Sequence, residues 1–526
     1  MQAQLDLRSC RVSRATVIEP PRYGAADVNR DFSAPVRGYR LGRNLLWNLA
    51  GTAAPMLAAL VCIPILVHAL GAQRFGVLAI AWALIGGFGL LDFASIALTK
   101  LIAERIGNGH SEQIPPLFWI GVLLTLASSA VLAGVFAAAC PFLVRHILKV
   151  PMALRLDTLN AFYLIAVAIP AVTLGKVFRG VLASLQRFDL VNYVRIPLSV
   201  LTFLGPVMVL PFTHSLVWAV AAIASAWIVS SLVQLIICFQ VIPCLASGPF
   251  FRLSLVPTLL SFGGWMTVFN ITVPLMVYVD RFVIGAMISM SAVAWYATPH
   301  EFVTKLSIVS AAGAGVLLPA LAESVEGDPG SIAGLVDWGM KYTILAMFPI
   351  TLVIETFARD GLDLWLGHGF ALHAAVALQW LGVGVFFNAM AAVPMMLILA
   401  VHRPDIPAKL HLVEAPLYLA VLYCLTYAYG INGVAAAAAM MFACDGLVWF
   451  AFARALVPAG AEPLRRSLWA MAASLPVFAL AVMLPDMPAV KLAFLCLALG
   501  IFALWAFCTL PLGVYGADRE SAQAST

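Results

Sequence analysis

The residues in this sequence that could do chemistry are the few charged side chains that interrupt long apolar stretches. Four of them are cations: Lys176, Arg179, Arg281 and Lys305. Arginine and lysine are the side chains that bind phosphate, arginine through a bidentate fork and lysine as a point charge. This set therefore predicts a cationic cavity that receives an anionic group, and a phosphate is the anion that suits it best.

A second set of ionisable residues lies close to these cations in the sequence. Glu301 and Lys305 are four residues apart, so on a helix they share one face. We interpret the second set as groups for ion coupling or for charge pairing with the cations: Asp92, Asp280, His300 and Glu301.

Each charged residue also has a purely structural interpretation. Glu301 and Lys305 could satisfy one another as an ion pair, and Arg179 could reach the cytoplasmic headgroups with its long side chain. Asp280 and Arg281 could neutralise neighbouring helices. Asp92 is better explained as a polar contact between helices than as a coupling group.

Composition identifies the environment in which these charges must be placed. The 526 residues are 63% hydrophobic and only 10% charged, and the mean hydropathy is +0.99. A soluble domain carries about 25% charged residues, so a soluble fold is excluded, and so is a disordered chain. A charge in hydrocarbon costs at least about 2.5–3.5 kcal/mol, so each one should face a cavity or a partner.

Apolar spans of about 20 residues recur along the chain, which predicts an all-α polytopic membrane protein rather than a lipid-facing β-barrel. Lys and Arg are more frequent in the loops on the side of the N-terminal tail, so both termini are expected to be cytoplasmic. We count about 14 transmembrane helices near 45–69, 76–98, 115–141, 158–182, 194–214, 216–242, 256–288, 291–321, 338–358, 374–400, 409–429, 431–457, 467–485 and 490–512.

An internal repeat groups these spans. Residues 70–72 (LGA) match 284–286 (IGA) at an offset of 214, and 187–189 (RFD) match 403–405 (RPD) at an offset of 216. The offset covers six spans, which predicts two parallel six-helix lobes and a C-terminal helix pair. The expected parts are a basic cytoplasmic tail (1–43), an N-lobe (44–245), a C-lobe (255–460), accessory spans 13 and 14 (465–513) and a second cytoplasmic tail (514–526).

Enzyme signatures are absent from the sequence. It contains no GxxxxGKS/T, HExxH or GxSxG motif and no large polar loop that could hold an active site. We therefore expect a transporter rather than an enzyme, with no cofactor, no metal site and no nucleic-acid partner.

Several segments resemble a known family. RNLLWNLAG, LGAQRFGVLAIAW and GLLDFASIALTKLIAERIG, between residues 43 and 107, resemble the start of Wzx-type polysaccharide or oligosaccharide flippases, which belong to the multidrug/oligosaccharidyl-lipid/polysaccharide (MOP) exporter superfamily. The resemblance extends over roughly residues 40–460. One departure is Ala94, where family members usually have glycine. Further matching segments are 178–196, 259–289 and 294–323.

The resemblance implies a function. Such proteins move an undecaprenyl-pyrophosphate-linked oligosaccharide repeat unit from the inner to the outer leaflet of the bacterial plasma (inner) membrane by alternating access, for surface or exported polysaccharide synthesis. It implies a proton or sodium gradient as the energy source, and a polysaccharide polymerase and co-polymerase as partners beside the lipid bilayer. The head group would pass through a cationic cavity, which maps onto Lys176, Arg179, Arg281 and Lys305.

Two alternatives remain open. An ion-coupled drug or small-molecule antiporter of the same superfamily would prefer an acidic cavity. A multipass polysaccharide polymerase or acyltransferase would need a long external loop or a histidine-based site, and the sequence has neither. A lipid II flippase is disfavoured because the first span lacks the arginines that those flippases carry there.

Overall fold

The computed structural model describes residues 36–90, 95–108, 113–247, 272, 276–327, 329–401, 403 and 405–509. The regular elements of these residues are all helices. Several predicted features lie outside the described residues: Asp92, most of the tail 1–43, most of the expected span 256–288, and the tail 514–526.

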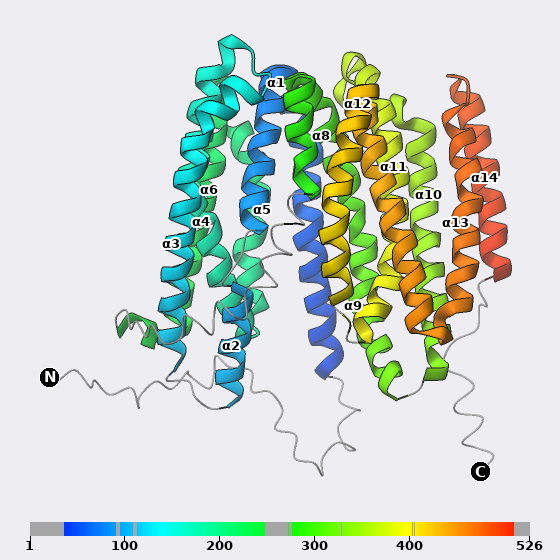
Figure 1. Ribbon diagram of the computed structural model, residues 1–526, viewed down its shortest axis with the longest axis horizontal. Helices are drawn as coiled ribbons and strands as arrows, with labels where there is room; N and C mark the ends of the chain where they lie inside the picture. The colour runs from blue at the N-terminus through cyan, green and yellow to red at the C-terminus, as the bar shows by residue number, and fades with distance from the viewer. Residues whose placement is uncertain are drawn as a thin grey trace. The chain divides into compact units, whose positions relative to one another are not determined.

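The helices of the first half follow the predicted spans closely (Figure 1). A short helical segment at 276–287 lies within the seventh span. The named elements are α1 (Val36–Leu90), α2 (Ser95–Gly107), α3 (Ile114–Phe142), η3 (Leu143–Ile147), η4 (Met152–Leu154), α4 (Arg155–Ser184), α5 (Phe188–Val209), α6 (Leu216–Val241) and η5 (Pro243–Ser247).

The second half is helical in the same way. Its elements are α8 (Met290–Thr304), η7 (Lys305–Ser307), α9 (Ile308–Glu326), η8 (Pro329–Ser331), α10 (Ile332–Leu366), α11 (His368–Ala400), α12 (Asp405–Leu456), η9 (Pro458–Gly460), α13 (Ala461–Val482) and α14 (Pro488–Thr509).

Nine helices among the described residues are long and apolar enough to cross a membrane. The prediction of an all-α, multi-pass membrane protein is confirmed. Two of these long elements, α1 and α12, each consist of two helices that correspond to two predicted spans. The two helices are joined at a glycine with positive φ, where the chain turns. The glycines are Gly71 in α1 (φ 75°) and Gly430 in α12 (φ 59°), and a left-handed backbone of this kind is open to glycine at little cost.

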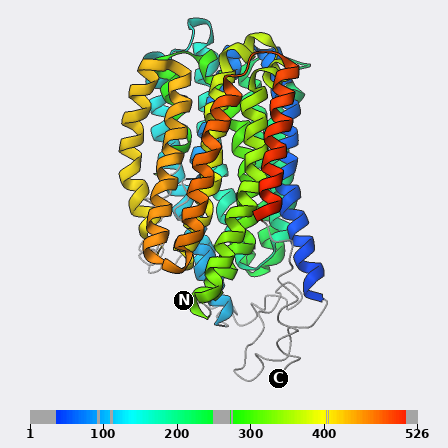
Figure 2. The same ribbon diagram turned by 90° about the vertical axis from the view of Figure 1, so that its right-hand side faces the viewer.

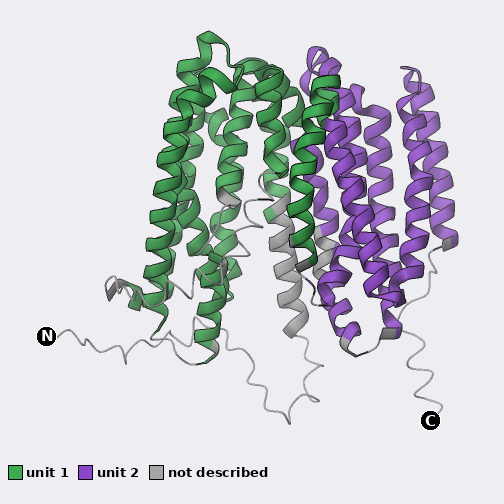
Figure 3. Cartoon of the chain, in the orientation of Figure 1, with its two compact units in different colours: residues 1–298, 406–434 green, residues 299–405, 435–526 purple. Residues whose placement is uncertain are grey.

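The chain divides into two compact units (Figure 3). Unit 1 comprises Met1–Thr298 and Ile406–Val434, and unit 2 comprises Pro299–Asp405 and Ala435–Thr526. These boundaries differ from those of the expected N-lobe and C-lobe, because residues 276–298 and 406–434 group with the first half. The parallel lobes related by a repeat stay a prediction.

Unit 1 has its core where α2, α3, α4 and α6 pack together. Phe118 stacks on Phe178 with ring centroids 6.1 Å apart, and Trp119 meets Phe118 edge-on at 5.5 Å. Small residues bring α2 and α4 close: a Cβ on Gly180 would lie 2.6 Å from Thr99 Oγ1. Close approach of backbones at small residues is the usual way in which helices associate in lipid.

Unit 2 has its core among α10, α11, α13 and α14, which run side by side in both ribbon views (Figure 1, Figure 2). Phe348 of α10 stacks on Phe502 of α14 at 4.5 Å and on Phe478 of α13 at 5.4 Å. Phe478 also meets Phe386 of α11 at 5.3 Å. This aromatic cluster fixes the face that α10 presents to its neighbours, two helical turns before Glu355.

Candidate functional site

The cations of α4 lie beside α2. Lys176 and Arg179 are half-buried, one turn apart. The Ser95 hydroxyl of α2 donates to the Lys176 carbonyl at 3.1 Å, and Arg179 Nε donates to the Gly175 carbonyl at 3.3 Å. The contact between α2 and α4 therefore holds the backbone from which both cationic side chains extend.

Asp280 and Arg281 form a buried ion pair on the helical segment 276–287. The Asp280 residue is 2% exposed and the Arg281 residue is 4% exposed. Asp280 Oδ1 accepts the Arg281 backbone N–H at 2.7 Å and Arg281 Nη1 at 3.4 Å. Asp280 Oδ2 accepts the hydroxyl of the fully buried Tyr296 at 2.6 Å. Both carboxylate oxygens are thus hydrogen-bonded, as a buried charge requires.

Arg281 finds further partners on its own helical segment. Its Nη1 donates to the Val277 carbonyl at 3.2 Å, and its guanidinium lies 5.3 Å from the centre of the Tyr278 ring. A cation over an aromatic face is attracted by the ring quadrupole. This geometry agrees with the structural interpretation of Asp280 and Arg281 as a self-neutralised pair; the cavity role of Arg281 stays a prediction.

Lys305 lies at a break in the helix and not in its middle. We expected one continuous span at 291–321, but α8 ends at Thr304 and a 3₁₀ turn, η7, separates it from α9. Lys305 Nζ contacts Glu301 Oε1 at 2.6 Å, and each side chain is 28% exposed. The predicted i,i+4 pair is therefore present, and the tighter 3₁₀ turn begins where it ends. His300, one residue before Glu301, is buried.

The predicted residues are divided between the two units. Lys176, Arg179, Asp280 and Arg281 belong to unit 1, whereas His300, Glu301 and Lys305 belong to unit 2. Within unit 1 the two cation pairs lie against different helices. Lys176 and Arg179 are beside α2, and the segment of Arg281 lies beside α1, where the Tyr278 hydroxyl reaches Gly86. A single cavity shared by the four cations stays a prediction.

Arg195 is a cation that our sequence analysis missed. It is half-buried on α5, its Nη2 lies against Gly51 of α1, and its Nε has no hydrogen-bond partner among the described residues. It lies at the start of the expected span 194–214, but it was not included among the charges within the spans. In the structure α5 begins at Phe188, two turns earlier, which places Arg195 inside the helix.

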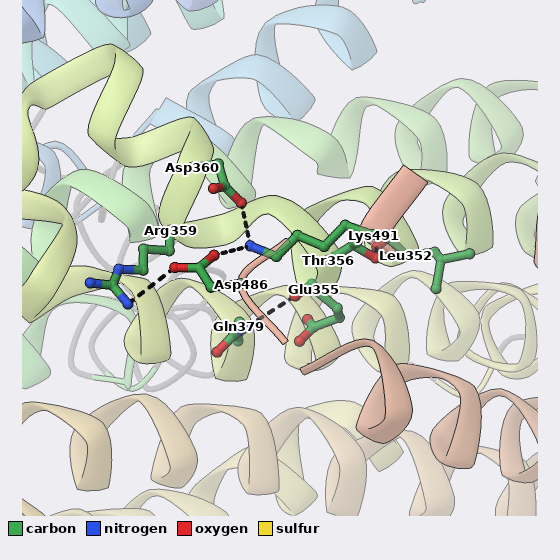
Figure 4. Close-up of polar contacts among 8 residues, drawn as sticks. All are labelled: Leu352, Glu355, Thr356, Arg359, Asp360, Gln379, Asp486 and Lys491. Carbon is green, nitrogen blue, oxygen red and sulfur yellow. Dashed lines mark hydrogen bonds and ion pairs between the residues drawn. The ribbon is translucent and has the colours of Figure 1, made fainter. Parts of the chain in front are cut away.

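Glu355 is an acid that the sequence analysis also missed. It lies near the end of the predicted span 338–358, and in the structure it is only 1% exposed. Gln379 of α11 donates its side-chain N–H to the Glu355 backbone carbonyl at 3.0 Å (Figure 4). The signal in the sequence was a lone acid inside an apolar run, four residues before the charged pair Arg359 and Asp360.

A cluster of four charges lies one turn beyond Glu355 (Figure 4). Lys491 Nζ of α14 contacts Asp360 Oδ2 and Asp486 Oδ1, both at 2.6 Å, and Arg359 contacts Asp486 Oδ2 at 3.5 Å. The Lys491 side chain is 8% exposed, whereas its partners are about half-exposed. These contacts tie α14 to α10.

Asp486 occupies the turn between α13 and α14, outside the membrane-spanning segments. The hydrogen bond from Lys491 and the positive charge of the same lysine hold the pKa of the Asp486 carboxyl below its usual range, with a smaller contribution from Arg359. Asp486 is therefore ionised at neutral pH and completes the cluster as an anion.

Two cavities in the described residues are apolar. One, of about 530 Å³, lies among α10, α13 and α14 and includes Phe348, Phe502 and Trp505. The other, of about 600 Å³, lies between α5 and α6. Neither is lined by a predicted site residue, so neither corresponds to the predicted cationic cavity.

The long apolar helices define a multi-pass membrane protein. Residues 41–325 match the family described as "Polysaccharide biosynthesis protein", and the chain belongs to this family. A curated relative from Shigella flexneri, "Putative O-antigen transporter", is 30% identical over 77% of this chain and 96% of its own length.

Solved structures of two kinds share the fold. The inward closed conformation of the lipid II flippase MurJ matches 87% of this chain and 98% of its own, with a TM-score of 0.64 and 13% identity. An inward-facing multidrug resistance MATE family transporter of the MOP superfamily matches 79% of this chain and 95% of its own, with a TM-score of 0.62 and 15% identity.

These likenesses confirm two predictions. The resemblance to flippases of the MOP superfamily is confirmed by the family match and by the folds of both solved transporters. The prediction of a transporter rather than an enzyme is confirmed as well, because the relatives are transporters and flippases.

Proposed function

We propose that this protein is a flippase for a lipid-linked oligosaccharide in the bacterial inner membrane. Its substrate is an undecaprenyl-pyrophosphate-linked repeat unit, which moves from the inner to the outer leaflet by alternating access. The observation that carries this proposal is the 30% identity to the "Putative O-antigen transporter", which extends over 96% of that protein. The shared fold with a lipid II flippase supports it.

The intramembrane charges support an anionic head group. Among the described helices of unit 1, Lys176, Arg179 and Arg195 are half-buried cations, and Arg281 is a buried cation that pairs with the buried acid Asp280. A pyrophosphate needs cations along its path. A drug antiporter that carries cationic compounds would be better served by an acidic path, so the MATE-like fold alone does not favour that function.

The remaining parts of the proposal concern topology and energy. The excess of Lys and Arg on the side of the N-terminal tail supports cytoplasmic termini, and Arg359 and Lys491 would then lie at the outer surface. A proton or sodium gradient supplies the energy. The flipped repeat unit then passes to a polysaccharide polymerase and its co-polymerase.

The test is a leaflet assay in cells that lack their own O-unit flippase. The amount of lipid-linked oligosaccharide open to a membrane-impermeant glycosidase from the outer side would be measured with and without the full chain. We expect the accessible fraction to rise severalfold when the chain is expressed. An unchanged fraction, at normal protein levels, would overturn the proposal.

Double substitutions separate a substrate-binding role of the cations from a structural one. Arg281→Gln removes the cation that contacts the buried Asp280, whereas Asp280→Asn with Arg281→Gln removes both charges. If Arg281 binds the head group, flipping is lost in both variants. If the pair is only structural, the double variant recovers.

The same design applies to Glu301 and Lys305, by comparing Lys305→Gln with the double variant that also carries Glu301→Gln. Arg466→Gln is the matched control, since that arginine is 71% exposed and pairs with Glu462 at one end of α13.

A further inference from the structure

Glu355 is a buried acid whose carboxyl contacts no charged side chain in the part of the chain that the structure describes. It is 1% exposed, and its Oε1 has no hydrogen-bond partner among the described residues. Thr351, one turn earlier on α10, is fully buried and its Oγ1 also lacks a partner in the described part of the chain. Two unsatisfied oxygens thus follow one another on the same helix face.

The backbone of α10 is irregular at this point. Phe357, two residues after Glu355, has non-helical angles (φ −118°, ψ 17°). A regular helix satisfies each carbonyl with the N–H four residues on. Here the Gln379 side chain of α11 donates to the Glu355 carbonyl at 3.0 Å, so α11 supports the backbone at the irregular turn.

Room for the Glu355 carboxyl is made by Gly382 of α11. A Cβ on Gly382 would lie 2.8 Å from Glu355 Oε1 and 3.0 Å from Ile354 Cγ2. The carboxyl therefore points at the face of α11 where that helix has no side chain. Polar groups in such packed positions normally have partners, so an unpartnered one calls for an explanation.

The charged residues nearest to Glu355 in sequence, and the charged residue of α14, form ion pairs within one cluster. Arg359 and Asp360 follow Glu355 on α10, and they join Asp486 and Lys491 in the cluster of ion pairs described above. These side chains are linked in a chain of contacts that does not include the Glu355 carboxyl (Figure 4).

The other helices packed against α10 have no charged residue at the level of Glu355 among their described residues. From residue 374 to Ala400 of α11 and from residue 467 to Val482 of α13, the sequence contains no titratable residue. The acids of α9, Glu323 and Glu326, lie in its last turns, next to the start of α10.

Near the end of α8, Phe302 contacts Trp365 of α10 at 6.1 Å, and its charged neighbours Glu301 and Lys305 pair with one another. A carboxylate that is 1% exposed and contacts no cation among the described residues is poorly stabilised, which favours the neutral acid.

We propose that Glu355 is a proton-binding site of unit 2. The carboxylate takes up one proton from water to become a carboxylic acid and releases it again, and no other bond changes. Arg359 and Asp360 are about half-exposed and begin only four residues later, about 6 Å along the helix axis. The route between the buried carboxyl and water is therefore one helical turn.

The ligand is a proton rather than a metal cation, because few oxygens are available. A hard cation needs several oxygen ligands, whereas Glu355 Oε1 has only Thr351 Oγ1 as a second unsatisfied oxygen on its helix face. The Gln379 side-chain amide donates to the Glu355 backbone carbonyl, so its nitrogen adds no oxygen ligand to the site. If the protein is the flippase proposed above, this site would take its proton from the outer surface and serve as the coupling site.

Infrared difference spectroscopy on the full chain in lipid bilayers tests proton binding directly. The wild-type protein should show the C=O stretch of a protonated carboxyl near neutral pH, and the band should shift in D₂O. Glu355→Gln should remove that component, whereas Glu462→Gln, an exposed acid paired with Arg465 and Arg466, should leave it unchanged. An identical band in the Glu355→Gln protein would overturn the proposal.

A second variant keeps the test decisive if Glu355→Gln does not fold. Gly382→Ala crowds the carboxyl without removing it, so its band should move in frequency and persist. If the wild-type band is lost when choline chloride is replaced with sodium chloride, the site binds sodium, and the proposal of a proton-binding site is overturned. The spectrum needs no glycan substrate, so a normal band together with a failed leaflet assay would reject the proposed flippase function alone.

Discussion

Two buried acids in this protein are treated in opposite ways. Asp280 in unit 1 is 2% exposed and its two oxygens accept hydrogen bonds from Arg281 and Tyr296. Glu355 in unit 2 is 1% exposed and its Oε1 has no partner in the described residues. Burial is the same in both cases, and the partners differ. Removal from water therefore does not decide by itself whether an acid is kept as an anion.

The difference teaches what each acid can do. Asp280 has a cation next to it in the chain and a hydroxyl donor from Tyr296, and both contacts favour its ionised form. Glu355 is stable as a neutral acid, and it lies one turn from water-exposed charges, so it can change its protonation without unfolding the helix. Substitution of each acid by its own amide tests this contrast, because the amide keeps the shape and removes the charge.

Asp280→Asn should have the largest effect. The amide removes the negative charge that Asp280 provides to the guanidinium of Arg281, which is 4% exposed, and breaking a buried pair in this way costs about 3–5 kcal/mol. Unfolding of the purified protein in detergent, followed by tryptophan fluorescence, would measure the loss. Adding Arg281→Leu should restore part of the stability. If Asp280→Asn alone were as stable as the wild type, the ion pair would not contribute to the free energy of unfolding.

Much of this arrangement could be predicted from the sequence, since hydropathy alone locates most spans to within a few residues. The turns at Gly71 and Gly430 fall between predicted spans, where a short connection was expected. The pair of Glu301 and Lys305 follows from its spacing. These features depend on local sequence, which a pattern can read.

Contacts between distant segments could not be predicted. Whether Asp280 or Glu355 has a partner depends on Tyr296, Gln379 and Gly382, and no sequence pattern identifies which of them meet. Glu355 itself was overlooked because a span boundary is uncertain by a few residues, so an acid near it is read as interfacial. The break at Lys305 was missed because the apolar stretch predicted as one span, 291–321, continues on both sides of it.

Lys491→Met should have an intermediate effect on stability. It measures what an ion pair contributes when the partner carboxylates are also exposed to solvent. Methionine keeps the apolar stem, while Asp360 and Asp486 stay about half-exposed and hydrated after the lysine is lost. Because exposed partners are screened, we expect a loss of only about 1 kcal/mol. The same unfolding assay would measure it, with hydrogen exchange of α14 amides as a second readout. If Lys491→Met lost as much stability as Asp280→Asn, the solvent exposure of the partner charges would not determine what an ion pair contributes.

The pH dependence of this cluster should be smaller still and has a defined sign. Lys491 lowers the pKa of Asp486 in the folded protein, so the contribution of Asp486 is complete above the ordinary pKa of an aspartate and is lost as pH falls through the lowered value. The melting temperatures of wild type and Asp486→Asn should therefore differ at neutral pH and converge in acid. A difference that grows as pH falls would contradict the ion pair.

Glu355→Gln should change stability least, by less than about 1 kcal/mol at neutral pH, because an amide replaces a neutral carboxyl of nearly the same shape. Its Nε2 would even bring donors to a site whose neighbour, Thr351 Oγ1, lacks a partner. The same unfolding assay, run beside Asp280→Asn, makes the comparison direct. A loss of about 3 kcal/mol for Glu355→Gln would mean that this acid is ionised and paired like Asp280, and the contrast between the two units would be wrong.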